Sequence, residues 1–189
     1  MAADPGPWQI LNKRVIHTSP WGINVALWSV RLPDGHVAKD HPVLEHLRPA
    51  LGVVPIAEDG RVLLIDYYRV FTDRRGWELP AGRVNAGESV DEAAKRELLD
   101  ETGYAAAAWE TLGEYHPSNE SSNQVFHLKI ARQLTRRSEP TDRNETMALR
   151  WFSVPEIREL VRRNEIYDGL SLTWFCWAIT LGFVPPTSP

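Results

Sequence analysis

The stretch that most constrains this chain runs from Ser89 to Gly103, where helix start and stop signals frame strong helix formers. Ser89 and Glu92 have the spacing of a capping box, in which a hydroxyl and a carboxylate satisfy free N–H groups of the first turn. Gly103 stands where a left-handed C-terminal cap usually falls. Alanine and leucine between these signals provide an apolar face. We therefore predict a helix over residues 90–102.

Three carboxylates share neighbouring positions on this predicted helix. Glu97 and Glu101 are four residues apart, and Asp100 lies three residues after Glu97, so the three project from one face. Like charges in this arrangement repel one another, whereas a hard divalent cation with oxygen ligands would turn the repulsion into attraction. The alternative interpretation is a solvated acidic face with no ligand. The residues around the helix favour the cation.

The sequence from Gly82 to Tyr104 resembles the Nudix box, G-x5-E-x7-R-E-U-x-E-E-x-G-U, in which U is a bulky aliphatic residue. Seven residues match the pattern at its spacing: Gly82, Glu88, Arg96, Glu97, Leu98, Glu101 and Gly103. Two positions depart from it, since Asp100 stands where the family has glutamate and Tyr104 replaces the last aliphatic residue. The resemblance implies a Nudix hydrolase.

The resemblance also implies roles for residues in and just before the box. Arg96 would orient a carboxylate, and Glu88 would support the geometry of the loop and the helix. Magnesium, or manganese, would bridge the substrate diphosphate and activate the attacking water. The metal ligands would be the backbone carbonyl of Ala81 and the carboxylates of Glu97, Asp100 and Glu101. Asp100 is the least secure of these, because its side chain is one methylene shorter than glutamate.

Composition excludes several classes of protein. The 189 residues carry a net charge of −4, which gives no electrostatic footprint for general nucleic-acid binding. No stretch approaches the ~20 apolar residues of a membrane span, and residues 1–8 lack the pattern of a secretory signal. We therefore expect a soluble cytoplasmic protein. The single cysteine, Cys176, lies between aromatic residues, and we expect it to be buried as a small hydrophobe.

The remaining pattern predicts strands before and after the helix. Residues 8–46 are β-rich, with a strand at 23–32, a turn at Pro33-Asp34-Gly35 and a returning strand at 36–43. Residues 51–57 and 61–68 are nearly continuous apolar runs, and we expect them to form a second hairpin covered on both faces. Further strands are predicted at 105–115, 124–131 and 149–154, and helices at 155–163 and 170–181. Trp174, Phe175 and Trp177 would belong to the core.

This order of elements predicts an α/β fold, a mixed β-sheet between helices. The resemblance implies the same architecture, the Nudix α/β/α sandwich, preceded by a small N-terminal antiparallel β region. We divide the chain into an N-terminal β region, residues 1–46, and a catalytic domain, residues 47–189. In the branch described next, the N-terminal region often forms a dimer and contacts the base of the substrate.

Features outside the box resemble the branch that hydrolyses ADP-ribose and nucleotide sugars. Tyr67-Tyr68-Arg69 is similar to an aromatic-Arg element whose arginine contacts the diphosphate, a task suited to the forked guanidinium. The prolines usual after that arginine are absent. The run 77–82 resembles the lead-in to the box, in which Glu78 either contacts substrate or caps the loop. A surface position at the end of a strand is the alternative for Arg69.

A late glutamate should act as metal ligand or general base in this branch. Glu145 is our candidate and Glu139 is its rival, and either one could instead be ordinary loop charge. The loop after the box has Pro117-Ser118 where the ADP-ribose subgroup usually has Pro-Gly, so the sugar end of the pocket could differ. For an aromatic platform under the base, Trp28 and Trp21 are candidates, although structural packing is the more frequent use of such tryptophans.

From these observations we predict a Mg²⁺-dependent, homodimeric diphosphatase. It would cleave a nucleoside diphosphate sugar, ADP-ribose first, into a nucleoside monophosphate and a sugar phosphate. The residues predicted to act in catalysis or to bind substrate, beyond the metal ligands, are Arg96, Glu145, Arg69, Glu78 and Trp28. The alternatives are a hydrolase of GDP-mannose or of another nucleotide sugar, an enzyme of another Nudix branch acting on capped RNA or damaged triphosphates, and a non-catalytic regulator that binds nucleotides.

Overall fold

The chain forms two compact units in a computed structural model, which describes residues 8–141 and 147–183. The first unit contains the described residues up to Pro49 together with Ser118–Val125, and the second contains the rest. The boundary in the first part of the chain therefore follows Pro49 rather than residue 46. The short segment 118–125, which the sequence placed with the catalytic domain, belongs to the N-terminal unit.

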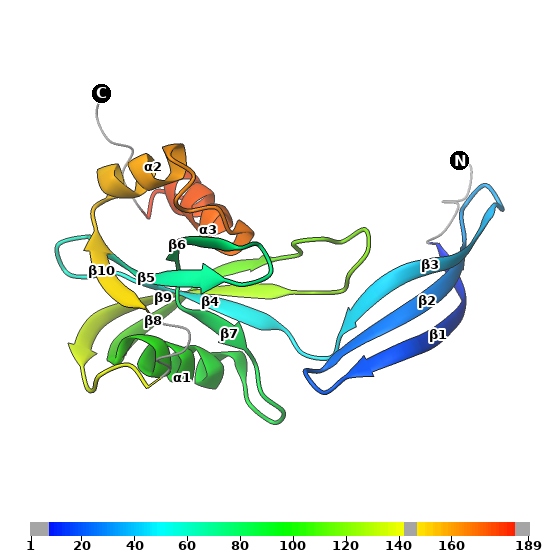
Figure 1. Cartoon of the computed structure of the whole chain (residues 1–189), viewed down its shortest axis with the longest axis horizontal. Coiled ribbons are helices and arrows are strands. Elements are labelled where there is room, and N and C mark those ends of the chain that lie inside the picture. Colours follow the sequence, from blue (N-terminus) through cyan, green and yellow to red (C-terminus); the bar gives the residue numbers. More distant parts are fainter. Residues whose placement is uncertain (1–7, 142–146, 184–189) are drawn as a thin grey trace, which may run out of the picture. The chain divides into compact units, whose positions relative to one another are not determined.

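The N-terminal unit is a three-stranded antiparallel sheet (Figure 1). Its strands are β1 (Gln9–Ser19), β2 (Ile23–Arg31) and β3 (Val37–His46), in the order β1-β2-β3. The predicted turn joins β2 to β3, and Gly35 there has a φ of 87°, which suits glycine. Residues 118–125 attach to β3, where the backbone N–H of Leu44 donates to the carbonyl of Ser121 at 2.9 Å.

The second unit contains two sheets. The four-stranded sheet has the order β7-β4-β9-β8, from β4 (Ala50–Pro55), β7 (Ala81–Arg83), β8 (Tyr104–Tyr115) and β9 (Phe126–Arg136). Its β4–β9 pair is parallel and its other pairs are antiparallel, so the sheet is mixed. The three-stranded sheet has the order β10-β5-β6, from β5 (Val62–Arg69), β6 (Arg74–Glu78) and β10 (Ala148–Phe152).

Helices cover the sheets on opposite sides, which confirms the predicted α/β fold (Figure 1). Helix α1 (Val90–Thr102) packs on one side, and α2 (Val154–Arg162) and α3 (Gly169–Thr180) pack on the other. The alternation of β4 explains this, because Leu51 and Val53 face α1 whereas Val54 belongs to the cluster with α2 and α3. No helix among the described residues is long and apolar enough to cross a membrane.

The predicted second hairpin is wrong. The segments at 51–57 and 61–68 are strands, β4 and β5, but they belong to different sheets. They meet beside the connecting turn, through a bridge between Ile56 and Val62 and a hydrogen bond from the N–H of Ala57 to the carbonyl of Arg61. β4 pairs with the distant strands β7 and β9, whereas β5 forms a hairpin with the next strand, β6, and pairs on its other side with the distant β10. The two short strands β6 and β7 were also missed, because they lie in a run that contains glycine and proline.

Two side-chain predictions are also wrong. Cys176 is exposed on α3, because the buried residues Trp174, Phe175 and Ala178 define a face that leaves position 176 outside. Trp21 is 73% exposed, so it does not pack into the core of the protomer as expected. Trp174 and Phe175 do lie in the core, and Trp177 packs against it, as predicted.

Candidate active site

Helix α1 begins and ends as its local signals predicted. Ser89 Oγ accepts from the backbone N–H of Glu92 at 3.2 Å, and a Glu92 carboxylate oxygen accepts from the N–H of Ser89 at 2.8 Å. At the other end of the helix the backbone of Gly103 is in the left-handed conformation, with a φ of 73°. The space beside its Cα is also occupied by neighbouring backbone atoms. A Cβ on Gly103 would lie 2.1 Å from the carbonyl oxygen of Ser138, so the position excludes larger residues.

Glu101 points from the helix toward the segment just before the box. The residue is 3% exposed, and its Oε2 accepts a hydrogen bond from the backbone N–H of Ala81 at 2.8 Å. Glu97 lies one turn earlier and reaches the next residue along, since a Cβ on Gly82 would stand 1.9 Å from its Oε1. The two carboxylates therefore converge on the Ala81–Gly82 backbone, which includes the carbonyl predicted as a metal ligand.

Arg96 connects the carboxylates of the box. Its Nη1 donates to Glu97 Oε1 at 2.7 Å, and its Nε donates to Glu88 Oε1 at 2.9 Å. Its Nη2 also donates to the backbone carbonyl of Arg83 at 3.0 Å. The Arg96 guanidinium lowers the pKa of Glu88 to about 2, with help from the N–H of Asn85. These contacts are those expected of residues that fix the Glu97 carboxylate and the preceding loop.

Asp100 turns to a different neighbour. Its backbone carbonyl accepts from the N–H of Thr141 at 2.8 Å, and its Oδ1 accepts from the Thr141 hydroxyl at 3.4 Å. Among the residues that the structure describes, no three His, Cys, Asp or Glu side chains are grouped closely enough to hold a metal ion. Two carboxylates and a backbone carbonyl still fit magnesium, which commonly uses one or two carboxylates with waters and substrate phosphates.

A cavity of about 580 Å³ adjoins Ala81 and Gly82. Arg69 and Glu78 line it, and they form an ion pair in which the Arg69 Nη2 approaches Glu78 Oε2 to 2.5 Å. The Arg69 guanidinium also lies 3.7 Å from the centroid of the Tyr67 ring, so it folds back along its own strand. Residues 65, 67 and 69 share one face of β5, and Ile65 lies opposite Glu78 on the neighbouring strand β6. Arg69 therefore reaches Glu78 by folding its side chain back along that face of β5.

Asp168 lines the same cavity and was not singled out from the sequence. It is the N-cap of α3, and its Oδ2 accepts from the backbone N–H of Ser171 at 2.8 Å. Its other oxygen, Oδ1, is buried without a hydrogen-bond partner among the described residues. Burial raises the pKa of Asp168, and the nearby charge of Glu78 adds to the effect. An aspartate before an apolar run is an N-cap signal that could have identified it.

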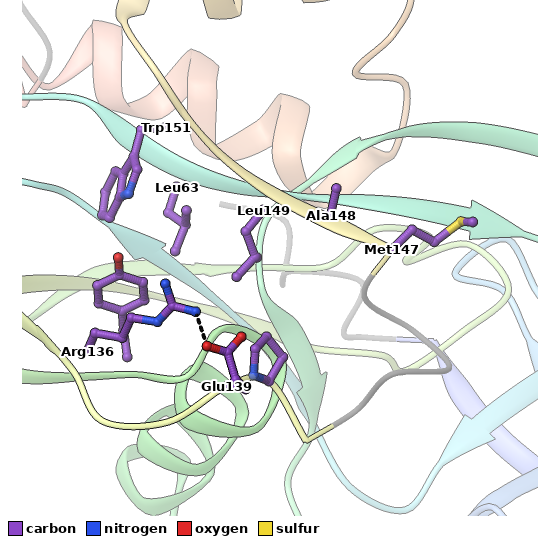
Figure 2. Close-up of a pocket in the computed structure, with 9 residues that line it drawn as sticks. Leu63, Arg136, Glu139, Met147, Ala148, Leu149 and Trp151 are labelled. Atoms are coloured by element: carbon purple, nitrogen blue, oxygen red, sulfur yellow. Dashed lines mark hydrogen bonds and ion pairs between the residues drawn. The ribbon is translucent and has the colours of Figure 1, made fainter.

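A second hollow, of about 500 Å³, lies near the C-terminal end of α1. Figure 2 shows Trp151, Leu149 and Met147 along one side of it and Arg136 on the other. Glu139 contributes to this hollow, where Arg136 Nη2 donates to its Oε1 at 2.6 Å. None of the residues lining it is a predicted metal ligand, so we assign the candidate active site to the first cavity.

Two predicted residues are not among the described residues that line this cavity. Glu145 falls in residues 142–146, which lie outside the described part of the chain. Trp28 belongs to the N-terminal sheet, where its Nε1 donates to Glu45 Oε1 at 2.8 Å and the Lys13 ammonium lies 3.6 Å from the ring centroid. The roles of Glu145 as base and of Trp28 as platform for the base stay predictions.

Residues 46–175 match the NUDIX domain. The chain is 30% identical over 162 residues to an ADP-ribose pyrophosphatase of Mycobacterium tuberculosis, which covers 83% of this chain and 77% of that protein. It is 26% identical over 149 residues to an ADP-ribose pyrophosphatase of Bacillus subtilis, with 78% and 80% covered. A crystal structure of an ADP compounds hydrolase has the same fold, with a TM-score of 0.80 at 22% identity over 92% of each chain.

Proposed function

The chain belongs to the Nudix family, and on that premise we propose that it hydrolyses nucleoside diphosphate sugars, with ADP-ribose as the preferred substrate. Water adds to one phosphorus, the bridging P–O bond breaks, and the products are a nucleoside monophosphate and a sugar phosphate. The observation that carries the proposal is the convergence of Glu97 and Glu101 on Ala81 and Gly82, beside the cavity that Arg69 lines. The ADP-ribose pyrophosphatases among the relatives support the choice of substrate.

Nudix hydrolases generally use divalent metals, and we propose Mg²⁺, with Mn²⁺ as a substitute. Glu97, Glu101 and the Ala81 carbonyl would hold it, and Asp100, whose Oδ1 accepts from the Thr141 hydroxyl, is the least secure ligand. When bound, the ion neutralises charge on the diphosphate and lowers the pKa of a water. Arg96 keeps the Glu97 carboxylate oriented through its Nη1 contact. Site residues held this way need little rearrangement during the reaction, which favours electrostatic catalysis.

Arg69 and Glu145 complete the proposed mechanism. The Arg69 guanidinium binds phosphate oxygens of the substrate, because a planar fork matches their geometry. Glu78 sets its direction through their ion pair. Glu145 accepts the proton of the attacking water, with Glu139 as the rival base. Glu139 pairs with Arg136 at the second hollow (Figure 2), which favours Glu145.

We extend the proposal to a homodimer formed through the N-terminal unit. Its edge strand β1 is exposed along nearly its whole length, and several apolar side chains there and nearby face solvent in the protomer. A long exposed edge with apolar residues favours pairing with another chain. The apolar residues are Trp8, Ile10, Leu11, Val15, Ile16 and Trp21. Light scattering at micromolar concentration should give twice the 21.5 kDa protomer mass, and a monomer would contradict this part of the proposal.

The central experiment compares Glu97→Gln and Glu101→Gln with a control. Each variant should lower kcat on ADP-ribose by about 100-fold or more, since a preorganised electrostatic group is removed. Glu110→Gln is the matched control, because Glu110 is a solvent-exposed carboxylate on β8 that makes only a long ion pair, 3.9 Å, with Arg132 among the described residues. Near-normal turnover in both site variants would overturn the mechanism.

A substrate panel tests the proposed specificity. ADP-ribose, GDP-mannose, another nucleotide sugar, capped RNA and an oxidised nucleoside triphosphate should be compared in Mg²⁺, with product identification in isotopically labelled water. We expect the highest kcat/KM for ADP-ribose, and the label identifies the attacked phosphorus. Faster hydrolysis of capped RNA or the triphosphate would assign the chain to another Nudix activity. Tight calorimetric binding of ADP-ribose without hydrolysis of any substrate would instead indicate a regulator.

A further inference from the structure

The turn between β5 and β6 forms one rim of the candidate active-site cavity. Phe71, in this turn, lines the cavity together with Arg69 and Thr72. Its side chain is fully exposed, at 101%, the highest value among the exposed large hydrophobic residues described. No ring contact to Phe71 is present among the described residues. An aromatic ring at the cavity rim is thus open to solvent and stacks on no other ring in the part of the chain that the structure describes.

The turn that presents Phe71 is held on both sides. The Tyr68 hydroxyl donates to Asp73 Oδ1 at 2.8 Å, across the base of the turn. The Thr72 hydroxyl lies 3.4 Å from the hydroxyl of Tyr167, which belongs to the segment between α2 and α3. Tyr167 in turn donates to the backbone carbonyl of Arg74 at 3.2 Å. Phe71 is therefore carried by an anchored turn, which restricts where its ring can reach.

The position of Phe71 relative to Arg69 defines what could cover its ring. Single exposed apolar residues are ordinary on protein surfaces, and Val70 is one example, at 66% exposure. Phe71 differs because it lines the cavity, two residues after the arginine proposed to bind the diphosphate. A substrate held there by its phosphates carries an aromatic base a few bonds away. A flat aromatic face next to a phosphate-binding guanidinium suits that base.

We propose that Phe71 is the stacking platform for the substrate's base, a role that the sequence had led us to give to Trp28. This inference rests on the proposed function, because it requires the diphosphate to bind beside Arg69. Stacking uses the π face common to all bases, so Phe71 contributes affinity with little discrimination among them. The prolines usual after this arginine are replaced by Val70 and Phe71, which gives the turn its aromatic side chain.

The test compares two substrates and four proteins. The substrates are ADP-ribose and the corresponding diribosyl diphosphate, which lacks the base. The proteins are wild type, Phe71→Ala, Phe71→Trp and the control Val70→Ala. Phe71→Ala should raise KM for ADP-ribose about 5- to 150-fold, the range given by alanine substitution of stacking residues, with a smaller change in kcat. Phe71→Trp should keep KM for ADP-ribose near the wild-type value, and Val70→Ala should leave it unchanged. KM for the base-free substrate should be the same in all four proteins.

Other outcomes overturn the inference. An equal rise in KM for both substrates would mean that Phe71 shapes the turn rather than contacts the base. Loss of dimer mass in Phe71→Ala would indicate that a second copy of the chain covers the ring. If KM for ADP-ribose is unchanged in Phe71→Ala and rises strongly in Trp28→Ala, Trp28 rather than Phe71 stacks on the base.

A binding measurement separates this inference from the proposed function. Adenosine 5′-monophosphate contains the base and a phosphate but requires no turnover, so its affinity can be measured by calorimetry. If wild type hydrolyses neither substrate, the proposed function fails, and stacking is still judged by this affinity. A loss of about 5-fold or more in Phe71→Ala relative to Val70→Ala supports the platform, and equal affinities remove it.

Discussion

Gly82 and Glu97 approach so closely that no side chain fits between them, since a Cβ on Gly82 would lie 1.9 Å from Glu97 Oε1 and 2.1 Å from Cδ. The backbone before the box therefore leaves the space that the carboxylate fills. Gly82 does not have a positive φ, so the requirement for glycine arises from contact with Glu97 rather than from backbone conformation.

The first prediction follows from this contact. Gly82→Ala should displace the Glu97 carboxylate and lower kcat by about 100-fold, because a shift of about 1 Å in a catalytic group can cost that much. A Mg²⁺ titration of the activity should also show weaker metal binding, that is, a higher Mg²⁺ concentration at half-maximal activity. Circular dichroism and thermal unfolding would check that the fold survives. Normal kcat in a folded variant would show that Glu97 can move without consequence.

The second prediction concerns Arg69. Arg69→Lys should raise KM for ADP-ribose about 10-fold or more, because a lysine cannot donate two parallel hydrogen bonds to phosphate. Glu78→Gln should have a smaller effect, since Arg69 stays but is held less firmly. Arg75→Lys is the matched control, because Arg75 pairs with Asp66 across the same two strands and does not line the cavity. Equal effects of all three substitutions would indicate a general weakening of the sheet.

The third prediction is an acid-dependent loss of stability at Glu88. Arg96 lowers the pKa of Glu88 to about 2 in the folded protein, from 4.5. The carboxylate therefore stabilises the fold fully above about pH 4.5, and this contribution disappears as the pH falls through 2. Urea unfolding of wild type and Glu88→Gln should show a difference in unfolding free energy at pH 6 that shrinks toward pH 2. Parallel pH profiles would contradict the role of the ion pair.

The fourth prediction is a loss of stability as the pH rises, caused by Asp168. Burial raises its pKa from 3.8, so the folded state favours the protonated acid and stability falls as the pH rises from 3.8 through the folded pKa. Asp168→Asn keeps an oxygen to cap α3 and removes the buried charge. It should raise the unfolding free energy at pH 7.5 and change it little at pH 3.5, as measured in urea. A less stable variant at pH 7.5 would mean that the charge is compensated in the fold.

Local sequence determined the helix at the centre of the site. The capping box, the alanine and leucine run and Gly103 fixed its bounds at Val90 and Thr102, because each signal acts within a few residues. The helical period also fixed that Glu97 and Glu101 share a face. The strands of the core were likewise recognisable as apolar runs, and most of their bounds were correct within about three residues.

Only the tertiary structure decided which segments meet. β4 and β5 looked like a hairpin, yet β4 pairs with β7 and β9, and β5 pairs with β6 and with the distant β10. The contacts of Glu101 with Ala81 and of Asp100 with Thr141, and the place of Asp168 in the cavity, depend on those pairings. A capping box or a helical face is set by neighbours in sequence, whereas sheet order and side-chain contacts arise from packing between distant segments, which no local pattern records.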